Sequence, residues 1–287
     1  MATITPQWHE PRSLDEALSL RSEHGEEATV VAGGSFLGIV MNQGFLSPTM
    51  LVALRNVPDL DYIEPEDGRL RIGAMTTHRA VERSPAVRDD WPSLAFTFSV
   101  VASPRVRNQA TVGGVVADAD YASDPPAMLA ALNARVVARS VRGEREIPMD
   151  EFVLDHYETA LEDDELVIEV RVPRGSGPSV YRKFRSRSGE DRPCVSVAAA
   201  RDEGSLRVVV GAVAGRPQYF PEVCDLAHGE RLDGELAAEM GRRYAEQIEP
   251  LSDSRGSARY RRRVVAVEVR RAIEDLMAPP GKPGRHD

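Results

Sequence analysis

The chain has 287 residues, 42% hydrophobic and 28% charged, which is an ordinary composition for a globular protein. Its 36 Lys and Arg against 45 Asp and Glu give a net charge of −9, which disfavours a nucleic-acid partner. Two cysteines are too few for an iron–sulfur cluster, no apolar run approaches the roughly 20 residues of a membrane span, and no signal-peptide layout is visible, so we expect a cytoplasmic protein.

The part of the sequence up to residue 170 predicts short helices and strands in irregular order. Ser13 and Glu16 form a capping box, so a helix is expected from about residue 14. An apolar strand at 29–32 runs into a glycine pair, and the segment 35–44 predicts a helix. The other elements expected here are strands at 50–54, 70–73, 136–138 and 166–170 and helices at 77–84, 94–101 and 127–132.

The clearest domain boundary is the Pro/Gly/Ser-rich run from Pro173 to Pro178. We therefore divide the chain into residues 1–177, residues 178–278 and a tail, 279–287, that we expect to be disordered. After the boundary, two antiparallel strands are expected at 195–200 and 206–214, and helices near 234–247 and 257–277. This irregular order of strands and helices predicts an α+β fold.

The last helix is expected to be amphipathic. Val264, Val267, Ile273 and Leu276 are assigned to its apolar side, and Arg261, Arg262, Arg263, Arg270 and Arg271 largely to the rest of its surface. We interpret the arginines as a solvated face of an acidic protein and not as a nucleic-acid contact.

The signatures of many enzyme classes are missing. No histidine pair has the spacing of a helical metal site, and no nucleophile elbow, dinucleotide-binding Gly-x-Gly-x-x-Gly motif or phosphate-loop lysine is present. The acidic run 162–165 is interpreted as a solvated turn, with an active pair of acids as the weaker alternative. We therefore assign no catalytic residue and no metal site.

Two glycine pairs are the best candidates for a binding site. The first lies in Ala32-Gly33-Gly34-Ser35-Phe36-Leu37 and the second in Thr111-Val112-Gly113-Gly114, and each is expected to join a strand to a helix. Glycine permits close approach of a ligand, and amides at the start of a helix favour phosphate. Asp124 could accept hydrogen bonds from sugar hydroxyls. A glycine pair is usually only a turn, and that interpretation stays open, but two pairs in one chain favour an extended phosphate ligand.

Several segments, taken in order, resemble the FAD-binding (medium) subunits of molybdenum hydroxylases, the carbon monoxide dehydrogenase and xanthine dehydrogenase family. The resemblance covers nearly the whole chain. The segments are the first glycine pair with its flanks, Val52 to Leu60, Ile72 to Thr77, Arg107 to Gly114, Ala122-Ser123-Asp124, Tyr181 to Arg187 and Gly256 to Arg262. Two positions depart from the family, since Val115 stands where asparagine is usual and Tyr121 where proline is usual.

The resemblance implies an N-terminal FAD-binding domain of two α+β subdomains (PCMH type) over 1–177 and a smaller α+β flavoprotein domain over 178–278. It implies that the loops carrying the two glycine pairs cradle the FAD pyrophosphate and that Asp124 binds the ribose or adenine side. Val101, Ala102, Leu166 and Lys183 would lie near the flavin, where a cation at Lys183 would stabilise the anionic reduced ring. The full set of implied cofactor-binding residues is Ala32, Gly33, Gly34, Ser35, Phe36, Leu37, Val101, Ala102, Thr111, Gly113, Gly114, Val115, Asp124, Leu166 and Lys183.

The resemblance also implies a division of labour. A separate molybdopterin-binding large subunit would oxidise the substrate, a small subunit with [2Fe–2S] clusters would carry electrons, and this chain would pass them through FAD to NAD, oxygen or a quinone. Two alternatives stay open: a free-standing FAD-dependent oxidoreductase, and a non-catalytic scaffold that has lost flavin.

Overall fold

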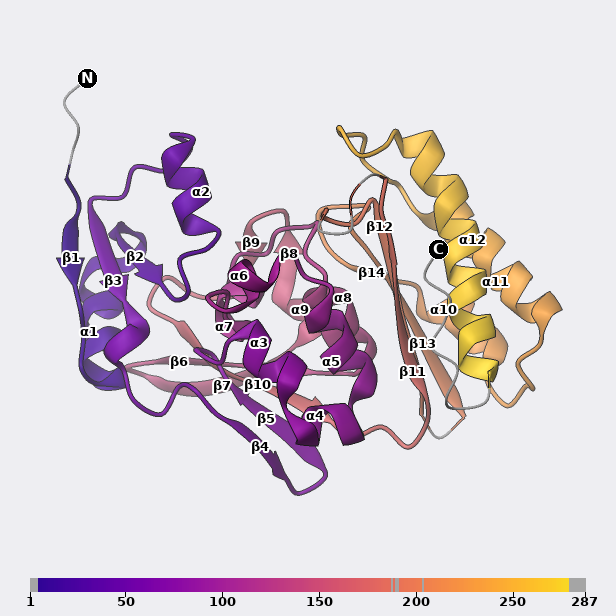
Figure 1. Ribbon diagram of the computed structural model, residues 1–287, viewed down its shortest axis with the longest axis horizontal. Helices are drawn as coiled ribbons and strands as arrows, with labels where there is room; N and C mark the ends of the chain where they lie inside the picture. The colour runs from indigo at the N-terminus through magenta and orange to yellow at the C-terminus, as the bar shows by residue number, and fades with distance from the viewer. Residues whose placement is uncertain (1–4, 187, 189–190, 203, 279–287) are drawn as a thin grey trace.

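The computed structural model describes residues 5–186, 188, 191–202 and 204–278, and the expected tail at 279–287 lies outside these residues. Helices and strands follow one another in irregular order, which confirms the predicted α+β class (Figure 1). The α-helices are α1 (Leu14–His24), α2 (Leu37–Asn42), α3 (His78–Arg83), α4 (Pro85–Asp90), α5 (Pro92–Ser99), α6 (Pro104–Arg107), α7 (Val112–Ala117), α8 (Pro125–Ala131), α9 (Met149–Phe152), α10 (Pro221–Cys224), α11 (Gly234–Gln247) and α12 (Ala258–Met277).

Within the described part of the chain, the strands form four separate sheets. They are β1 (Gln7–His9), β2 (Ala28–Val31), β3 (Met50–Ala53), β4 (Ile63–Glu66), β5 (Arg69–Gly73), β6 (Arg135–Ser140), β7 (Gly143–Pro148), β8 (Val153–Asp155), β9 (Glu158–Thr159), β10 (Leu166–Pro173), β11 (Ser179–Phe184), β12 (Val195–Asp202), β13 (Ser205–Gly211) and β14 (Gln218–Tyr219).

A small parallel sheet begins the molecule. Its strand order is β1-β3-β2, and the helix α1 lies beside it at one end of the molecule (Figure 1). Ser13 accepts a hydrogen bond from the Glu16 amide, as the capping box predicts, whereas the Glu16 carboxylate accepts from the Arg12 amide. The strand β2 ends just before the first glycine pair, so this sheet brings that pair against the backbone of Gln109, ahead of α7.

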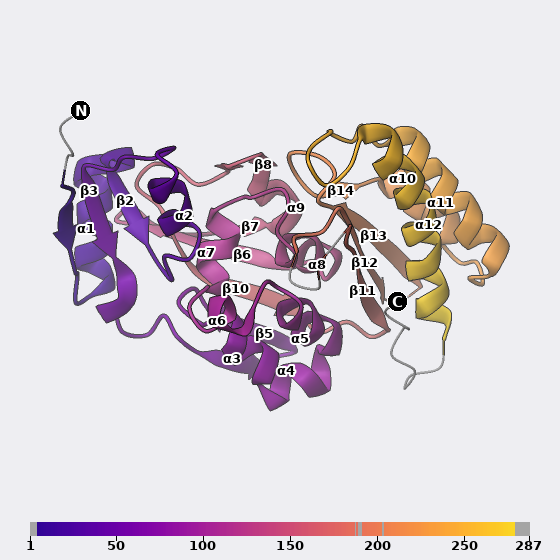
Figure 2. The same ribbon diagram turned by 45° about the horizontal axis from the view of Figure 1, so that its top comes forward.

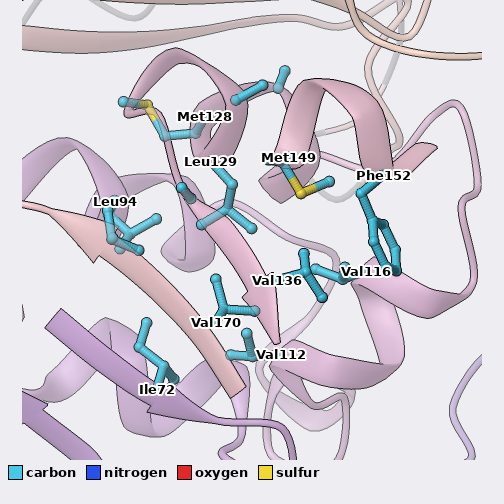
Figure 3. Packing of buried hydrophobic residues seen from close by; sticks show 14 of the residues in the cluster. Ile72, Leu94, Val112, Val116, Met128, Leu129, Val136, Met149, Phe152 and Val170 are labelled. Atoms are coloured by element: carbon cyan, nitrogen blue, oxygen red, sulfur yellow. The ribbon is translucent and has the colours of Figure 1, made fainter. Parts of the chain in front are cut away.

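The central sheet is antiparallel, with the order β4-β5-β10-β6-β7. Figure 3 shows Val112 and Val116 of α7 directed toward Val136 and Val170 of this sheet. These four side chains are completely or almost completely buried, because α7 packs against β5 and β10. The second glycine pair lies in α7, so the apolar residues of this short helix fix the pair against the sheet.

The C-terminal sheet has the order β11-β12-β13-β14 and carries helices on both faces. The helices α11 and α12 cover the face turned away from the rest of the molecule (Figure 1). The helix α8 packs on β12 and β13, at the side nearer the N-terminal region (Figure 2). The strands β12 and β13 and the helix α11 confirm the predicted elements, and no helix among the described residues is long and apolar enough to cross a membrane.

Two side chains of α12 correct the expected amphipathic pattern. Arg261, expected on the solvated side, is fully buried and donates to the Ala212 carbonyl oxygen at 2.9 Å and to the Asp253 carboxylate at 2.5 Å. Val267, expected on the apolar side, is 46% exposed. The buried positions of this helix instead repeat at three- and four-residue intervals from Arg261 to Leu276.

Candidate functional site

A cavity of about 930 Å³ lies where the loop after β2, the start of α7 and the strand β11 meet. Its volume is at the upper end of the range of about 300–1,000 Å³ that is typical of small-molecule sites. Every residue that the resemblance implies for cofactor binding lines this cavity, from Ala32 in the N-terminal region to Lys183 on β11. The structure therefore brings together positions that are spread over more than half of the chain.

The first glycine pair forms a loop with unused amides. Gly34 has a positive φ of 68°, which favours glycine, and an added Cβ at Gly33 would lie 1.9 Å from the Gln109 carbonyl oxygen. Among the described residues, no backbone hydrogen bond is donated by the N–H groups of Gly34, Ser35 and Phe36. The loop is therefore equipped to donate several backbone hydrogen bonds to an anionic group that enters the cavity.

The second glycine pair differs from its expected geometry. It lies in the first turn of α7 and follows the helix α6 and a turn, not a strand. Its nearby amides are already used: Val112 donates to the Thr76 carbonyl oxygen, Gly113 to that of Ala74 at 2.8 Å, and Gly114 to the Thr111 hydroxyl at 3.1 Å. An added Cβ at Gly113 would lie 2.6 Å from the Ala74 Cβ, so this glycine permits close packing of α7 on the chain after β5.

Asp124 and Lys183, which we expected to contact different parts of the cofactor, contact each other. The Lys183 ammonium donates to Asp124 Oδ2 and to the Val100 carbonyl oxygen, both at 2.8 Å, and the Tyr181 hydroxyl donates to Asp124 Oδ1 at 2.7 Å. Burial raises the pKa of Asp124, and the cation of Lys183 opposes that shift. The buried pair forms a polar wall of the cavity, and Lys183 keeps one N–H for a ligand.

Arg107 shapes another part of the cavity wall. Its guanidinium donates to the carbonyl oxygens of Val101 and Ala102, both at 2.9 Å, and to the Glu82 carboxylate at 2.9 Å. Ala102 has a positive φ of 41°, so these hydrogen bonds hold a backbone conformation that an L-residue rarely adopts. Arg107 was not predicted to have a role in the site, although its place just before the second glycine pair was the available signal.

Asp118 and Asp120 also line the cavity, although neither was predicted from the sequence to belong to the site. Asp120 is buried and forms an ion pair with Arg192, whose guanidinium lies 5.7 Å from the Phe36 ring centroid. Burial, followed by the nearby Asp120 carboxylate, raises the pKa of Asp118 to about 7. One wall of the cavity therefore carries a carboxyl group that exchanges its proton near neutral pH.

Comparison with known proteins identifies the family to which this chain belongs. Residues 3–175 match the FAD binding domain in molybdopterin dehydrogenase, and residues 179–276 match the CO dehydrogenase flavoprotein C-terminal domain. The chain is 34% identical over 273 residues to the nicotine 6-hydroxylase medium subunit of Paenarthrobacter nicotinovorans, covering 93% of this chain and 96% of that protein. It is 30% identical over 279 residues to the carbon monoxide dehydrogenase medium chain of Hydrogenophaga pseudoflava, covering 95% and 97%.

Solved structures agree with these relatives. A chain of the carbon monoxide dehydrogenase of Hydrogenophaga pseudoflava superimposes with a TM-score of 0.90 at 30% identity, covering 96% of this chain and 98% of that chain. A chain of quinoline 2-oxidoreductase from Pseudomonas putida 86 gives a TM-score of 0.89 at 30% identity, with the same coverage. The protein therefore belongs to the FAD-binding subunits of the molybdenum hydroxylase family, and its cofactor is FAD.

Proposed function

We propose that this chain is the electron-transfer subunit of a cytoplasmic molybdenum hydroxylase complex. In this proposal, a molybdopterin-binding large subunit oxidises the substrate, a small subunit carries the electrons through [2Fe–2S] clusters, and this chain delivers them to NAD, oxygen or a quinone. The observation that carries the proposal is the cavity whose one end presents the unused amides of residues 34–36. Those amides suit the diphosphate of a dinucleotide cofactor.

In this proposal, only one of the two glycine pairs holds the FAD pyrophosphate, whereas we had expected both to do so. The amides of the first glycine pair would hold the pyrophosphate, whereas the used amides of α7 would not. Gly113 would instead act by letting α7 pack close to the cavity floor. Asp124 would accept from sugar hydroxyls with its remaining lone pairs, and Val101, Ala102, Leu166 and Lys183 would line the flavin end.

The chemistry requires little acid–base work from the protein. Bound FAD supplies a ring that accepts electrons singly and releases them in pairs. The chain itself would orient that ring, exclude water from it and set the local charge. The Asp124–Lys183 pair contributes no net charge when both groups are ionised, and its burial keeps the two side chains in one geometry. We also propose that the Pro/Gly/Ser-rich run from Pro173 to Pro178 marks the boundary between a FAD-binding domain, 1–177, and a flavoprotein domain, 178–278.

The decisive experiment is purification of the chain together with the products of neighbouring genes, followed by a visible spectrum and metal analysis. Flavin absorbance with co-purifying iron and molybdenum is the expected result. Reduction of the flavin by substrate with the purified chain alone would instead favour a free-standing oxidoreductase. A colourless protein that cannot be reconstituted with FAD would favour a scaffold that has lost its cofactor.

A further inference from the structure

Tyr121 joins the cavity wall to the C-terminal region. It lies half-buried in the segment 118–124, between α7 and α8, and does not itself line the cavity. Its hydroxyl donates to Asp253 Oδ2 at 2.6 Å and accepts from Arg255, whose guanidinium lies 5.3 Å from the Tyr121 ring centroid. Asp253 also pairs with the buried Arg261. The Tyr121 hydroxyl is therefore hydrogen-bonded to a cluster of charged side chains, Asp253 and Arg255 in the loop before α12 and Arg261 in the first turn of that helix.

A second contact to the C-terminal region lies three residues further along the same segment. Asp124 accepts hydrogen bonds from Tyr181 and Lys183, both on β11. Between the two contacts, Ala122 and Ser123 line the cavity, together with Asp124 itself. Together with the Asp120–Arg192 ion pair, these contacts fasten this cavity wall to the C-terminal region from residue 120 to residue 124.

We infer that Tyr121 is a positioning residue for the cofactor and that FAD binding is linked to docking of the C-terminal region. This inference rests on the proposed function, because it takes the cavity as the FAD site. A ligand that needs the segment 118–124 in its anchored position binds only the fraction of molecules in which that segment is anchored. A change that lowers this fraction therefore raises the apparent Kd in the same proportion. Tyr121 does not reach the cavity, so its influence passes through the segment that it anchors.

The chain contains a matched control for Tyr121. The Tyr62 hydroxyl donates to the buried Glu169 carboxylate, and the Arg71 guanidinium lies 5.5 Å from the Tyr62 ring centroid. As at Tyr121, a tyrosine hydroxyl donates to a carboxylate and an arginine guanidinium lies near the tyrosine ring. Tyr62 and Glu169, however, both belong to the N-terminal region, and neither lines the cavity. Tyr62→Phe therefore reports the cost of losing such a hydroxyl without disturbing the contact between the two regions.

The test is a FAD titration of the full-length chain after removal of its flavin. We expect Tyr121→Phe to raise the Kd for FAD about five- to tenfold, within the usual range of coupling between sites. Tyr62→Phe should leave the Kd within twofold of the wild type. A second variant, Arg255→Gln, keeps the Tyr121–Asp253 hydrogen bond but removes the cation, and it should also raise the Kd. At saturating FAD, the visible circular dichroism of the flavin should differ between Tyr121→Phe and Tyr62→Phe.

The possible outcomes separate this inference from the proposed function. Equal Kd values for the wild type, Tyr121→Phe and Arg255→Gln would overturn the positioning role and leave FAD binding intact. An equal rise in Kd for Tyr62→Phe and Tyr121→Phe would also overturn it, because general destabilisation would then explain both. A wild-type chain that binds no FAD would remove the proposed function itself.

Discussion

His78 shows how one buried side chain at the cavity is held in a defined protonation state. Its Nε2 atom lies 3.2 Å from the Thr111 carbonyl oxygen, which can only accept, so Nε2 carries the hydrogen and Nδ1 is the acceptor. Nδ1 is buried without a hydrogen-bond partner among the described residues. Burial lowers the pKa of His78 to about 4. The folded protein therefore keeps this imidazole neutral at a pH where the unfolded chain protonates it.

The His78 pKa predicts a pH-dependent stability difference between the wild type and His78→Gln, a variant whose amide can still donate to Thr111. Between pH 6.5 and 4 the unfolded wild type binds a proton that the folded state does not, so its free energy of unfolding falls as the pH falls. The wild-type advantage over His78→Gln should therefore shrink by about 1.2 kcal/mol per pH unit between pH 6 and 4.5 and be nearly constant above pH 7. Urea unfolding at several pH values measures it.

A constant difference between His78→Gln and the wild type across this range would contradict the depressed pKa of His78. Subtracting the free energy of unfolding of His78→Gln from that of the wild type cancels the contributions of all other titratable groups. Asp118, whose pKa is raised to about 7, changes stability in the opposite direction over the same window, because its folded form binds the extra proton. Its contribution is present in both proteins and drops out of the comparison.

At the residue scale, the sequence predicted features whose cause is local. The Ser13 cap is an example, since the hydroxyl and the amide it accepts from are three residues apart. The role of Arg261 was not predictable in the same way. Its partners, Asp253 and the Ala212 carbonyl oxygen, are brought to it by the loop before α12 and by the chain after β13. A helical pattern identifies an apolar stripe, but it cannot show that a guanidinium within the stripe has a buried acceptor.

At the scale of elements, the two glycine pairs illustrate what periodicity misses. The loop after β2 was predicted in the right place because an apolar strand and a helix flank it. The second pair was misplaced after a strand because the four-residue helix α6 is too short to show a period of 3.6. Only the packing of α7 against Ala74 reveals that its amides are occupied.

The loop after β2 provides a prediction with a control on the neighbouring helix. An added Cβ at Gly34 would lie 3.6 Å from Val31 Cγ1, which is an ordinary contact. The positive φ should nevertheless cost Gly34→Ala about 1–2 kcal/mol of stability and, by relaxing the loop, lower its FAD occupancy. Gly38 lies in α2 with nothing within 4 Å of an added Cβ. Gly38→Ala should therefore gain about 0.5–1 kcal/mol and keep its flavin. Flavin absorbance per chain and thermal unfolding measure both effects.

The opposite result, with Gly34→Ala fully loaded and Gly38→Ala depleted of flavin, would show that the loop after β2 does not hold the cofactor. Gly33 is a poorer choice for this experiment. A side chain there would collide with the Gln109 carbonyl oxygen, so loss of flavin could not be separated from a displaced backbone.

At the scale of the whole molecule, the N-terminal and C-terminal regions share an apolar core. The largest core cluster contains Met128 and Leu129 of α8 together with Ala198 of β12 and Val209 of β13. Such a boundary is more apolar than the usual contact between independent domains, so the two regions should unfold together. The sequence located the chain segment that joins the regions, but not this contact, because the residues on its two sides are about 70 to 80 positions apart in the chain.

Cooperative unfolding can be tested with two valines of α12, since both tryptophans, Trp8 and Trp91, lie in the N-terminal region. Val265 is fully buried in the C-terminal core, whereas Val267 on the same helix is 46% exposed. We expect Val265→Ala to cost about 2 kcal/mol and Val267→Ala less than about 0.5 kcal/mol. In denaturant, tryptophan fluorescence follows the N-terminal region, and far-UV circular dichroism includes the long helices α11 and α12. If the regions unfold together, Val265→Ala shifts the fluorescence midpoint and the circular dichroism midpoint equally. A fluorescence midpoint that stays at the wild-type value would mean that the shared core does not couple the two regions.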